Sequence, residues 1–173
     1  MAMKLVAISG SLRKQSTNTT ALEAMRLLDS NIEILDLLGA LPHFNPDLDV
    51  EGATPPAIVD ELRKRLHAAD GLIISTPEYA HGLPGSLKNM LDWLVSDGLL
   101  VDKPVLLINA TPPATFAHAS LVEILETMNW RVLATIELPL RGKRLDARAI
   151  ASDEALSSLL RSGIVALERA IHA

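Results

Sequence analysis

The chain has 173 residues, with 16 basic and 21 acidic side chains, a formal net charge of −5, no cysteine and 3% aromatic residues. This length fits one domain whose core needs no disulfide or structural metal, and the lack of cysteine excludes a disulfide framework, a thiolate metal site and a cysteine nucleophile. The acidic balance and scarce aromatic residues argue against a nucleic-acid surface, and no apolar run approaches the ~20 residues of a membrane span.

The N-terminal Met1-Ala2-Met3-Lys4 runs straight into a short apolar strand over residues 4–9 and leaves no room for a signal peptide. Helical and strand patterns then alternate: a helix over 17–29, a strand over 32–36, a helix from about 58 that ends near 70, a strand over 71–76, a helix from 84 to about 95, a strand over 104–110, a helix over 117–127, a strand over 131–137 and a final helix over 152–171. Prolines and glycines between residues 39 and 56 predict one long loop. With no internal repeat or linker, we expect one cytoplasmic domain over residues 1–173.

Strands that alternate with helices form parallel βαβ units, with helices on both faces of the sheet. Five strands in this order predict an α/β fold, a three-layer, doubly wound, five-stranded parallel sheet. In such sheets, ligands bind beyond the carboxyl ends of the strands, where the strand order reverses. The loops after the first, third and fourth strands, residues 10–18, 77–84 and 111–118, are therefore the places where we expect a ligand.

The first of these loops concentrates hydroxyl, amide and guanidinium groups at the start of a helix, namely Ser11, Arg13, Ser16, Thr17 and Asn18. A helix N-terminus presents free N–H groups and the positive end of the helix dipole, so this set suits a phosphate monoester. The alternative is that Ser16 or Thr17 is only an N-cap and Arg13 a solvated loop charge. The loop has neither the GxGxxG of dinucleotide folds nor the Gly-Lys-Ser/Thr of a P-loop, which disfavours NAD bound in Rossmann fashion and ATP hydrolysis.

The second loop, residues 77–84, is a glycine-containing turn bounded by prolines at the end of a strand. Such a turn can supply backbone hydrogen bonds and a close approach to the edge of a planar ring system. The alternative is that Pro77 and Pro84 only stop a strand and start a helix, while Tyr79 fills a gap at the surface.

Together the two loops resemble the NADPH-dependent FMN reductase family, which includes quinone, azo-dye and chromate reductases. The matching residues are Gly10-Ser11-Leu12-Arg13 with Ser16 and Asn18, Pro77-Glu78-Tyr79, Pro84-Gly85 with Leu87-Lys88-Asn89, and Asp92-Trp93. The resemblance implies a flavodoxin-like sheet, bound FMN, NAD(P)H as co-substrate, and a homodimer or homotetramer with the helix after Pro84 at the subunit contact. Leu91, Leu94 and Val95 could supply the apolar residues of that contact, or pack inward.

The resemblance also implies the cofactor-binding residues: Ser11, Arg13, Ser16, Thr17 and Asn18 at the FMN phosphate, and Pro77, Glu78, Tyr79, Ala80 and His81 along the isoalloxazine. Two features depart from the family. Ala80 and His81 follow the tyrosine, where the family usually has asparagine, and residues 111–118 replace a glycine- and serine-rich loop with a bulkier one. His81 could take over the lost polar contact.

The function implied is transfer of electrons by a ping-pong mechanism, in which NAD(P)H gives a hydride to flavin N5 and leaves before a quinone, flavin, azo compound or metal oxyanion takes the electrons. The flavin carries the chemistry, so no catalytic residue and no metal site are expected. Two alternatives stay open: a non-enzymatic flavodoxin-type electron carrier, and a degenerate member that binds FMN weakly. Neither a membrane nor a nucleic acid is expected as a partner.

The sequence also contains isolated histidine, basic, tryptophan and acidic residues that could have a role at the site or in the core. His118, like His81, falls in a loop beside the ring and could donate to flavin or substrate, although a lone loop histidine is usually just solvated. The basic run 141–144 could attract the 2′-phosphate of NADPH, but a solvated turn is favoured. Trp93 and Trp130 are expected to be packing residues. Glu78 is expected to orient the backbone rather than to act as a general acid.

Overall fold

The computed structural model describes residues 3–173 and contains one five-stranded sheet in the order β2-β1-β3-β4-β5. The strands are β1 (Leu5–Ser9), β2 (Ile32–Leu35), β3 (Gly71–Ser75), β4 (Pro104–Asn109) and β5 (Arg131–Glu137), and all neighbours pair in parallel. The strand order reverses at β1, which lies between β2 and β3. The predicted parallel, doubly wound sheet is confirmed. The expectation about a signal peptide concerns Met1 and Ala2, which lie outside the described residues, and the single domain over residues 1–173 stays a prediction.

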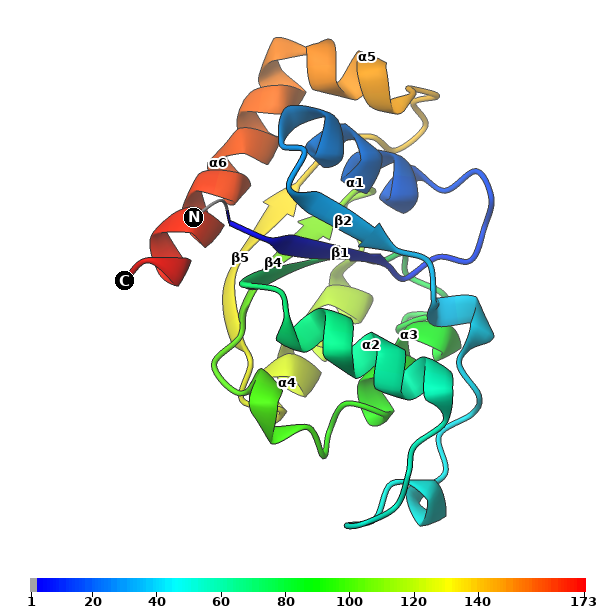
Figure 1. Ribbon diagram of the computed structural model, residues 1–173. Coiled ribbons are helices and arrows are strands. Elements are labelled where there is room, and N and C mark those ends of the chain that lie inside the picture. Colours follow the sequence, from blue (N-terminus) through cyan, green and yellow to red (C-terminus); the bar gives the residue numbers. More distant parts are fainter. Residues whose placement is uncertain (1–2) are drawn as a thin grey trace.

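Helices cover both faces of the sheet (Figure 1). They are α1 (Thr17–Leu28), α2 (Ala57–His67), α3 (Gly85–Asp92), α4 (Thr115–Thr127), α5 (Ala147–Ser152) and α6 (Glu154–Ile171). Helices α1, α5 and α6 lie on one face, and α2, α3 and α4 lie on the other. Each layer of helices closes its own apolar core against the sheet, because the central strands β1, β3 and β4 are buried on both faces. The molecule therefore has the three layers that the sequence predicts.

The end of the chain differs from the prediction, since α5 was not expected and α6 begins two residues later than the predicted helix. Aspartates explain both boundaries. The side chain of Asp146 accepts a hydrogen bond from Ala149 N at 2.7 Å, and that of Asp153 accepts one from Leu156 N at 2.9 Å. Each aspartate satisfies a free amide in the first turn of a helix, so the chain stops one helix at Asp153 and starts another.

Helix α3 is shorter than predicted and ends at Asp92. Leu91 and Leu94 are almost fully buried, whereas Val95 is 64% exposed, so the two leucines pack inward. Trp93 and Trp130 are buried, as predicted. Trp93 also fixes the long loop, because its indole N–H donates to the carbonyl oxygen of Pro42 at 2.9 Å.

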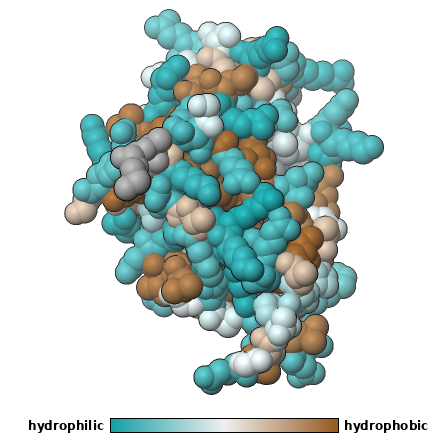
Figure 2. Space-filling model, in the orientation of Figure 1, coloured by the Kyte–Doolittle hydropathy of each residue, from teal (hydrophilic) through white to brown (hydrophobic). Residues whose placement is uncertain are grey.

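The long loop contains two short 3₁₀ turns, Leu38–Ala40 and Pro46–Leu48, and its second part projects from the body of the molecule (Figure 1). Arg63 on α2 pairs with Asp49 in this projection at 2.9 Å. Figure 2 shows this face in space-filling form, with hydrophilic side chains over most of it and apolar residues in separate patches. Across residues 3–173, no helix is both long and apolar enough to cross a membrane.

Candidate functional site

The loop after β1 leads directly into the N-terminus of α1, where Ser16 is the N-cap. Its hydroxyl accepts a hydrogen bond from Thr19 N at 3.5 Å, so the capping role considered for Ser16 is real. The cap leaves the preceding amides of the first turn, those of Thr17 and Asn18, without an acceptor among residues 3–173. These free N–H groups and the helix dipole together favour an anion at this end of the helix.

Three loops meet at this helix end and form an open cleft of about 160 Å³ at the carboxyl ends of β1, β3 and β4. Its lining includes seven of the ten predicted cofactor-binding residues: Ser11, Arg13, Ser16, Thr17, Asn18, Pro77 and Tyr79. Gln15 and Thr111 line it as well and were not singled out from the sequence. Both lie in the loops where a ligand was expected, so their position along the chain was the only signal that could have found them.

Asn18, in the first turn of α1, connects the start of this helix to the end of β3. The residue is 4% exposed, and its Oδ1 accepts a hydrogen bond from Ser75 Oγ at 2.9 Å. This bond orients the carboxamide and leaves its two N–H donors without a protein partner in the described part of the chain. A buried amide held in this way is a preorganised donor for an anionic oxygen in the cleft.

Gly10 lets the first loop pass close to the end of β3. A Cβ atom at this position would collide with the hydroxyl of Thr76 and would lie 2.9 Å from Thr76 Cβ. Gly10 N donates to Ser75 O at 2.8 Å, which holds the two backbone segments together. The absence of a side chain at Gly10 therefore sets the width of the cleft between the loops after β1 and β3.

The loop after β3 ends in a tight turn over residues 79–82. Tyr79 and Gly82 exchange two backbone hydrogen bonds of 3.0 Å, and the two central residues, Ala80 and His81, have φ values of 48° and 58°. Two successive left-handed residues define a turn that favours asparagine and glycine. This geometry gives a physical reason why the family usually has asparagine at the position after the tyrosine. Alanine at that position, Ala80, is held in a strained backbone conformation.

His81 does not line the cleft. Its ring stacks on that of Phe116, with centroids 4.4 Å apart and planes at 21°, so it connects the strained turn to the first turn of α4. Ala80 also stays outside the cleft lining. Both residues shape the turn that carries Tyr79, a residue that is 53% exposed and lines the cleft.

Replacing Ala80 by glycine is expected to stabilise the protein by about 0.5–1 kcal/mol, because glycine adopts the left-handed region without a Cβ clash. The measurement is the free energy of unfolding in urea. The matched control is Ala119→Gly at an exposed position inside α4, which should destabilise by about 1 kcal/mol because glycine is a poor helix former. Equal losses in the two variants would mean that Ala80 is not strained.

Glu78 does not line the cleft, but it fixes the position of one of the loops that form it. Its Oε2 accepts a hydrogen bond from Ala117 N at 2.9 Å, in the first turn of α4. The carboxylate thereby satisfies one free amide at this helix N-terminus and interacts favourably with the dipole. This contact ties the loop after β3 to α4, although the two residues are 39 positions apart.

His118 differs from the prediction of a ring-side loop residue. Helix α4 begins at Thr115, two residues earlier than predicted, so His118 belongs to its first turn and is only 8% exposed. In the described part of the chain neither ring nitrogen has a hydrogen-bond partner of good geometry, although the Ile108 backbone approaches the ring. Burial lowers the pKa of His118, against the opposing effect of the Glu137 and Glu78 carboxylates.

A lowered pKa means that the folded protein binds this proton less readily than the unfolded chain does. Protonation therefore favours the unfolded chain. The folded protein loses no stability in this way at pH values above the pKa of histidine in the unfolded chain, about 6.5, and loses progressively more as the pH falls below that value. Replacing His118 by leucine is expected to reduce this loss and, because a buried unpartnered N–H disappears, to stabilise the protein at neutral pH by roughly 1–3 kcal/mol.

Urea unfolding at pH 7 and pH 5 measures both effects of His118→Leu. The control is His43→Leu, which removes an exposed imidazole from the projecting loop. A His118→Leu protein that loses as much stability between the two pH values as the parent would show that this imidazole does not titrate as described.

The basic run 141–144 follows β5 and is exposed throughout. Gly142 has a φ of 75°, and Lys143 N donates to Leu140 O at 2.9 Å, so the segment is a surface turn. None of its residues lines the cleft. Within residues 3–173, no three His, Asp or Glu side chains are grouped so that they could hold a metal ion.

Sequence comparison identifies similar proteins with related descriptions. The profile of the family described as NADPH-dependent FMN reductase matches residues 3–143. An NAD(P)H-dependent FMN reductase of Pseudomonas aeruginosa is 44% identical over 94 residues, 53% of this chain and 49% of that protein. A quinone reductase of Escherichia coli K12 is 36% identical over 110 residues, 61% of this chain and 58% of that protein. The chain thus spans about half the length of the curated relatives it matches.

Solved structures share the architecture. The flavoenzyme NAD(P)H:(acceptor) oxidoreductase of Paracoccus denitrificans gives a TM-score of 0.80 at 23% identity, covering 98% of this chain and 97% of that chain. Oxidised flavodoxin from Bacillus cereus gives 0.56 at 19% identity, covering 95% and 97%. At these identities the similarity is one of fold, and it confirms the flavodoxin-like sheet.

Proposed function

The chain belongs to the NADPH-dependent FMN reductase family, and on this basis we propose that it binds FMN and acts as an NAD(P)H-dependent oxidoreductase. The observation that carries the proposal is the cleft at the strand-order reversal, where the loops after β1, β3 and β4 meet at the N-terminus of α1. Ligands of doubly wound sheets bind at this point.

The residues of the cleft fit FMN by their chemistry. The phosphate would lie at the start of α1, where hydroxyls, free amides, the Asn18 carboxamide and the Arg13 guanidinium provide donors of the kind that a phosphate accepts. Gly10 supplies the close backbone approach. The flavin ring would lie along Pro77 and Tyr79, with Thr111 on the far side of the cleft.

Bound FMN would supply two-electron chemistry between a reduced nicotinamide and an acceptor. The protein's part is to hold and orient. Glu78 fixes the loop after β3 on α4, and the stacked His81 and Phe116 rings fix the turn below Tyr79. We assign no side chain as a general acid or base.

We further propose ping-pong kinetics, with the oxidised nicotinamide leaving before the acceptor enters the same cleft. A quinone, flavin, azo compound or metal oxyanion is the acceptor class that we propose from the names of the relatives and the openness of the site. A cytoplasmic location is also proposed, and fractionation of cells that produce the protein tests it.

Titration with FMN followed by assay of NADPH oxidation in the presence of a quinone tests the activity. The proposal expects FMN binding, quinone-dependent loss of NADPH absorbance, and parallel double-reciprocal lines when both substrates are varied. FMN binding without NADPH oxidation would instead favour an electron carrier. A protein that binds no FMN would indicate a degenerate member of the family.

A homodimer or homotetramer is proposed from a groove between α3 and α4 of about 320 Å³. Val95, Val101, Ile124 and Met128 are among its lining residues, and Val95 and Val101 are 64% and 49% exposed. Exposed apolar side chains grouped along a groove favour a protein contact. Light scattering on the purified protein measures the mass, and a monomer would contradict the proposal.

A further inference from the structure

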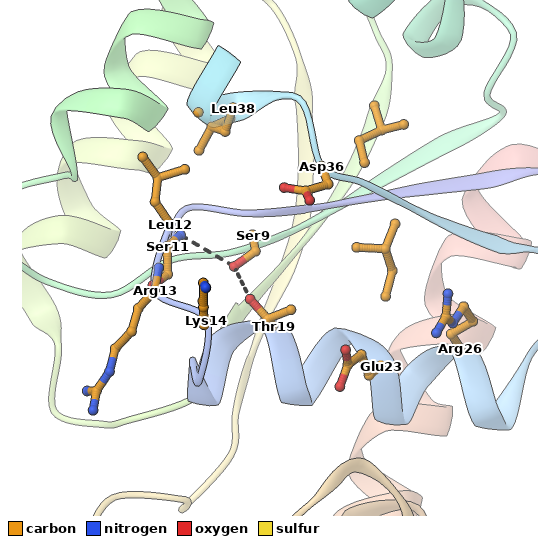
Figure 3. A pocket seen from close by; sticks show the side chains of 13 residues that line it. Ser9, Ser11, Leu12, Arg13, Lys14, Thr19, Glu23, Arg26, Asp36 and Leu38 are labelled. Carbon is orange, nitrogen blue, oxygen red and sulfur yellow. Dashed lines mark hydrogen bonds between the residues drawn. The ribbon is translucent and has the colours of Figure 1, made fainter. Parts of the chain in front are cut away.

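A second cleft lies on the other side of the loop after β1, away from the proposed FMN site. It has a volume of about 510 Å³ and opens between that loop, α1 and the segment after β2 (Figure 3). This volume is in the range of small-molecule sites, which is about 300–1,000 Å³. The proposed FMN cleft uses the β3 side of the same loop, so the second cleft is a separate space.

The lining of the second cleft combines charges of both signs with an apolar wall. Lys14 and Arg26 are exposed cations, and Asp36 and Glu23 are the acids. Across residues 3–173 these four side chains form no ion pair with one another or with any other group. Unpaired charges of both signs around one cavity can bind a ligand that carries both an anionic group and hydroxyl or amine donors.

The apolar wall is formed by Leu12, which is 57% exposed, and by the backbone at Gly39. A Cβ atom on Gly39 would lie 3.3 Å from Leu12 Cδ2, so the leucine packs closely over the segment after β2. Leu38 lies beside it in Figure 3. A planar base could stack on this wall, which would otherwise leave a large apolar side chain exposed to water.

Asp36 directly follows the carboxyl end of β2, next to the strand that leads into the phosphate-binding loop. An acidic residue in this place accepts hydrogen bonds from ribose hydroxyls in doubly wound folds that bind dinucleotides. The loop after β1 lacks the GxGxxG that holds the pyrophosphate in those folds and is assigned to the FMN phosphate, so only the ribose contact is taken from them. Lys14 and Arg26 flank the same cavity and can hold phosphate groups. We propose that the second cleft binds the adenosine phosphate half of NAD(P)H, with Asp36 at the ribose and Arg26 at a 2′-phosphate where one is present.

The two clefts share Ser11 and Arg13 in their lining, so they adjoin across one short segment of chain. Figure 3 shows the Arg13 guanidinium pointing away from Asp36 and Arg26, which leaves it available to the proposed FMN phosphate. The assignment rests on the proposed function. In a reductase the nicotinamide must reach the flavin in the first cleft, so the same nucleotide can extend its adenosine half across the loop after β1 into the second cleft.

Calorimetric titration of the FMN-loaded protein with 5′-AMP and with adenosine 2′,5′-bisphosphate tests the assignment without any redox reaction. Both nucleotides are expected to bind. Arg26→Ala should lower the preference for the bisphosphate over AMP by about tenfold, because one charge-assisted contact is lost. Asp36→Ala should weaken AMP binding and raise that preference, since a carboxylate that repels the 2′-phosphate is removed.

Arg161→Ala, which removes an exposed arginine from α6, is the matched control and should leave both affinities unchanged. Absence of binding by the parent protein, or affinities that neither Arg26→Ala nor Asp36→Ala alters, would overturn the assignment. FMN content, measured by absorbance on the same samples, separates the two proposals. If the protein does not retain FMN, the proposed function is contradicted, and the same nucleotide titration of the FMN-free protein still reports on the second cleft.

Discussion

Arg13→Ala is expected to weaken FMN binding by roughly one to two orders of magnitude. A hydrogen bond between a charged donor and a phosphate contributes about 1.5–3 kcal/mol, and tenfold in affinity corresponds to about 1.4 kcal/mol. Arg13 lines the proposed FMN cleft and is exposed, so its removal should change affinity without changing the stability of the fold. Fluorescence titration with FMN measures the dissociation constant.

The control for Arg13 is again Arg161→Ala, which makes the same change in net charge away from the phosphate-binding loop. Its affinity for FMN should equal that of the parent protein. Comparable affinity in the Arg13 variant would place the phosphate somewhere other than the start of α1 and would remove the chemical basis for the proposed cofactor site.

Gly10→Val is expected to lower both stability and FMN affinity, and it combines the largest effects expected for one substitution. Even a Cβ atom would collide with Thr76, which is 1% exposed and cannot move aside into solvent. Overpacking of this kind costs about 1–3 kcal/mol, and relief requires the loops after β1 and β3 to separate. That separation widens the cleft where FMN is proposed to bind.

Gly85→Ala is the matched control, because a Cβ atom at Gly85, the first residue of α3, meets nothing within 4 Å. It should leave the fold unperturbed. Urea unfolding and FMN titration of both variants measure the two effects. If Gly10→Val keeps the stability and affinity of the control, the loop is not held against Thr76 as described.

The order of elements and the place of the candidate site could be predicted from the sequence because both depend on local patterns. The spacing of apolar residues, together with the glycines and prolines that end each run, locates each strand and helix. Because the strands are parallel, the loops after β1, β3 and β4 then lie at the same edge of the sheet. The donors proposed for the phosphate are also local, since Ser11 to Asn18 lie on one loop and one helix start. Because these donors are close together along the chain, a single sequence is enough to predict the site.

Features that depend on contacts between distant segments could not be predicted. The start of α4 at Thr115 is supported by Glu78, a residue from another loop, and this start moves His118 into a buried position. The left-handed geometry of Ala80 runs against the backbone preference of alanine, so it could not be read from the residue type. Lys14, Arg26 and Asp36 are ordinary surface residues in sequence, and only the fold places them around one cavity.

The most direct test of the central proposal is the visible absorption spectrum of the purified protein after incubation with FMN and gel filtration, before and after NADPH is added without oxygen. The proposal predicts that flavin absorbance comes off the column with the protein, at one FMN per chain, and is bleached by NADPH. A colourless protein after gel filtration, with all FMN in the small-molecule fraction, would contradict it.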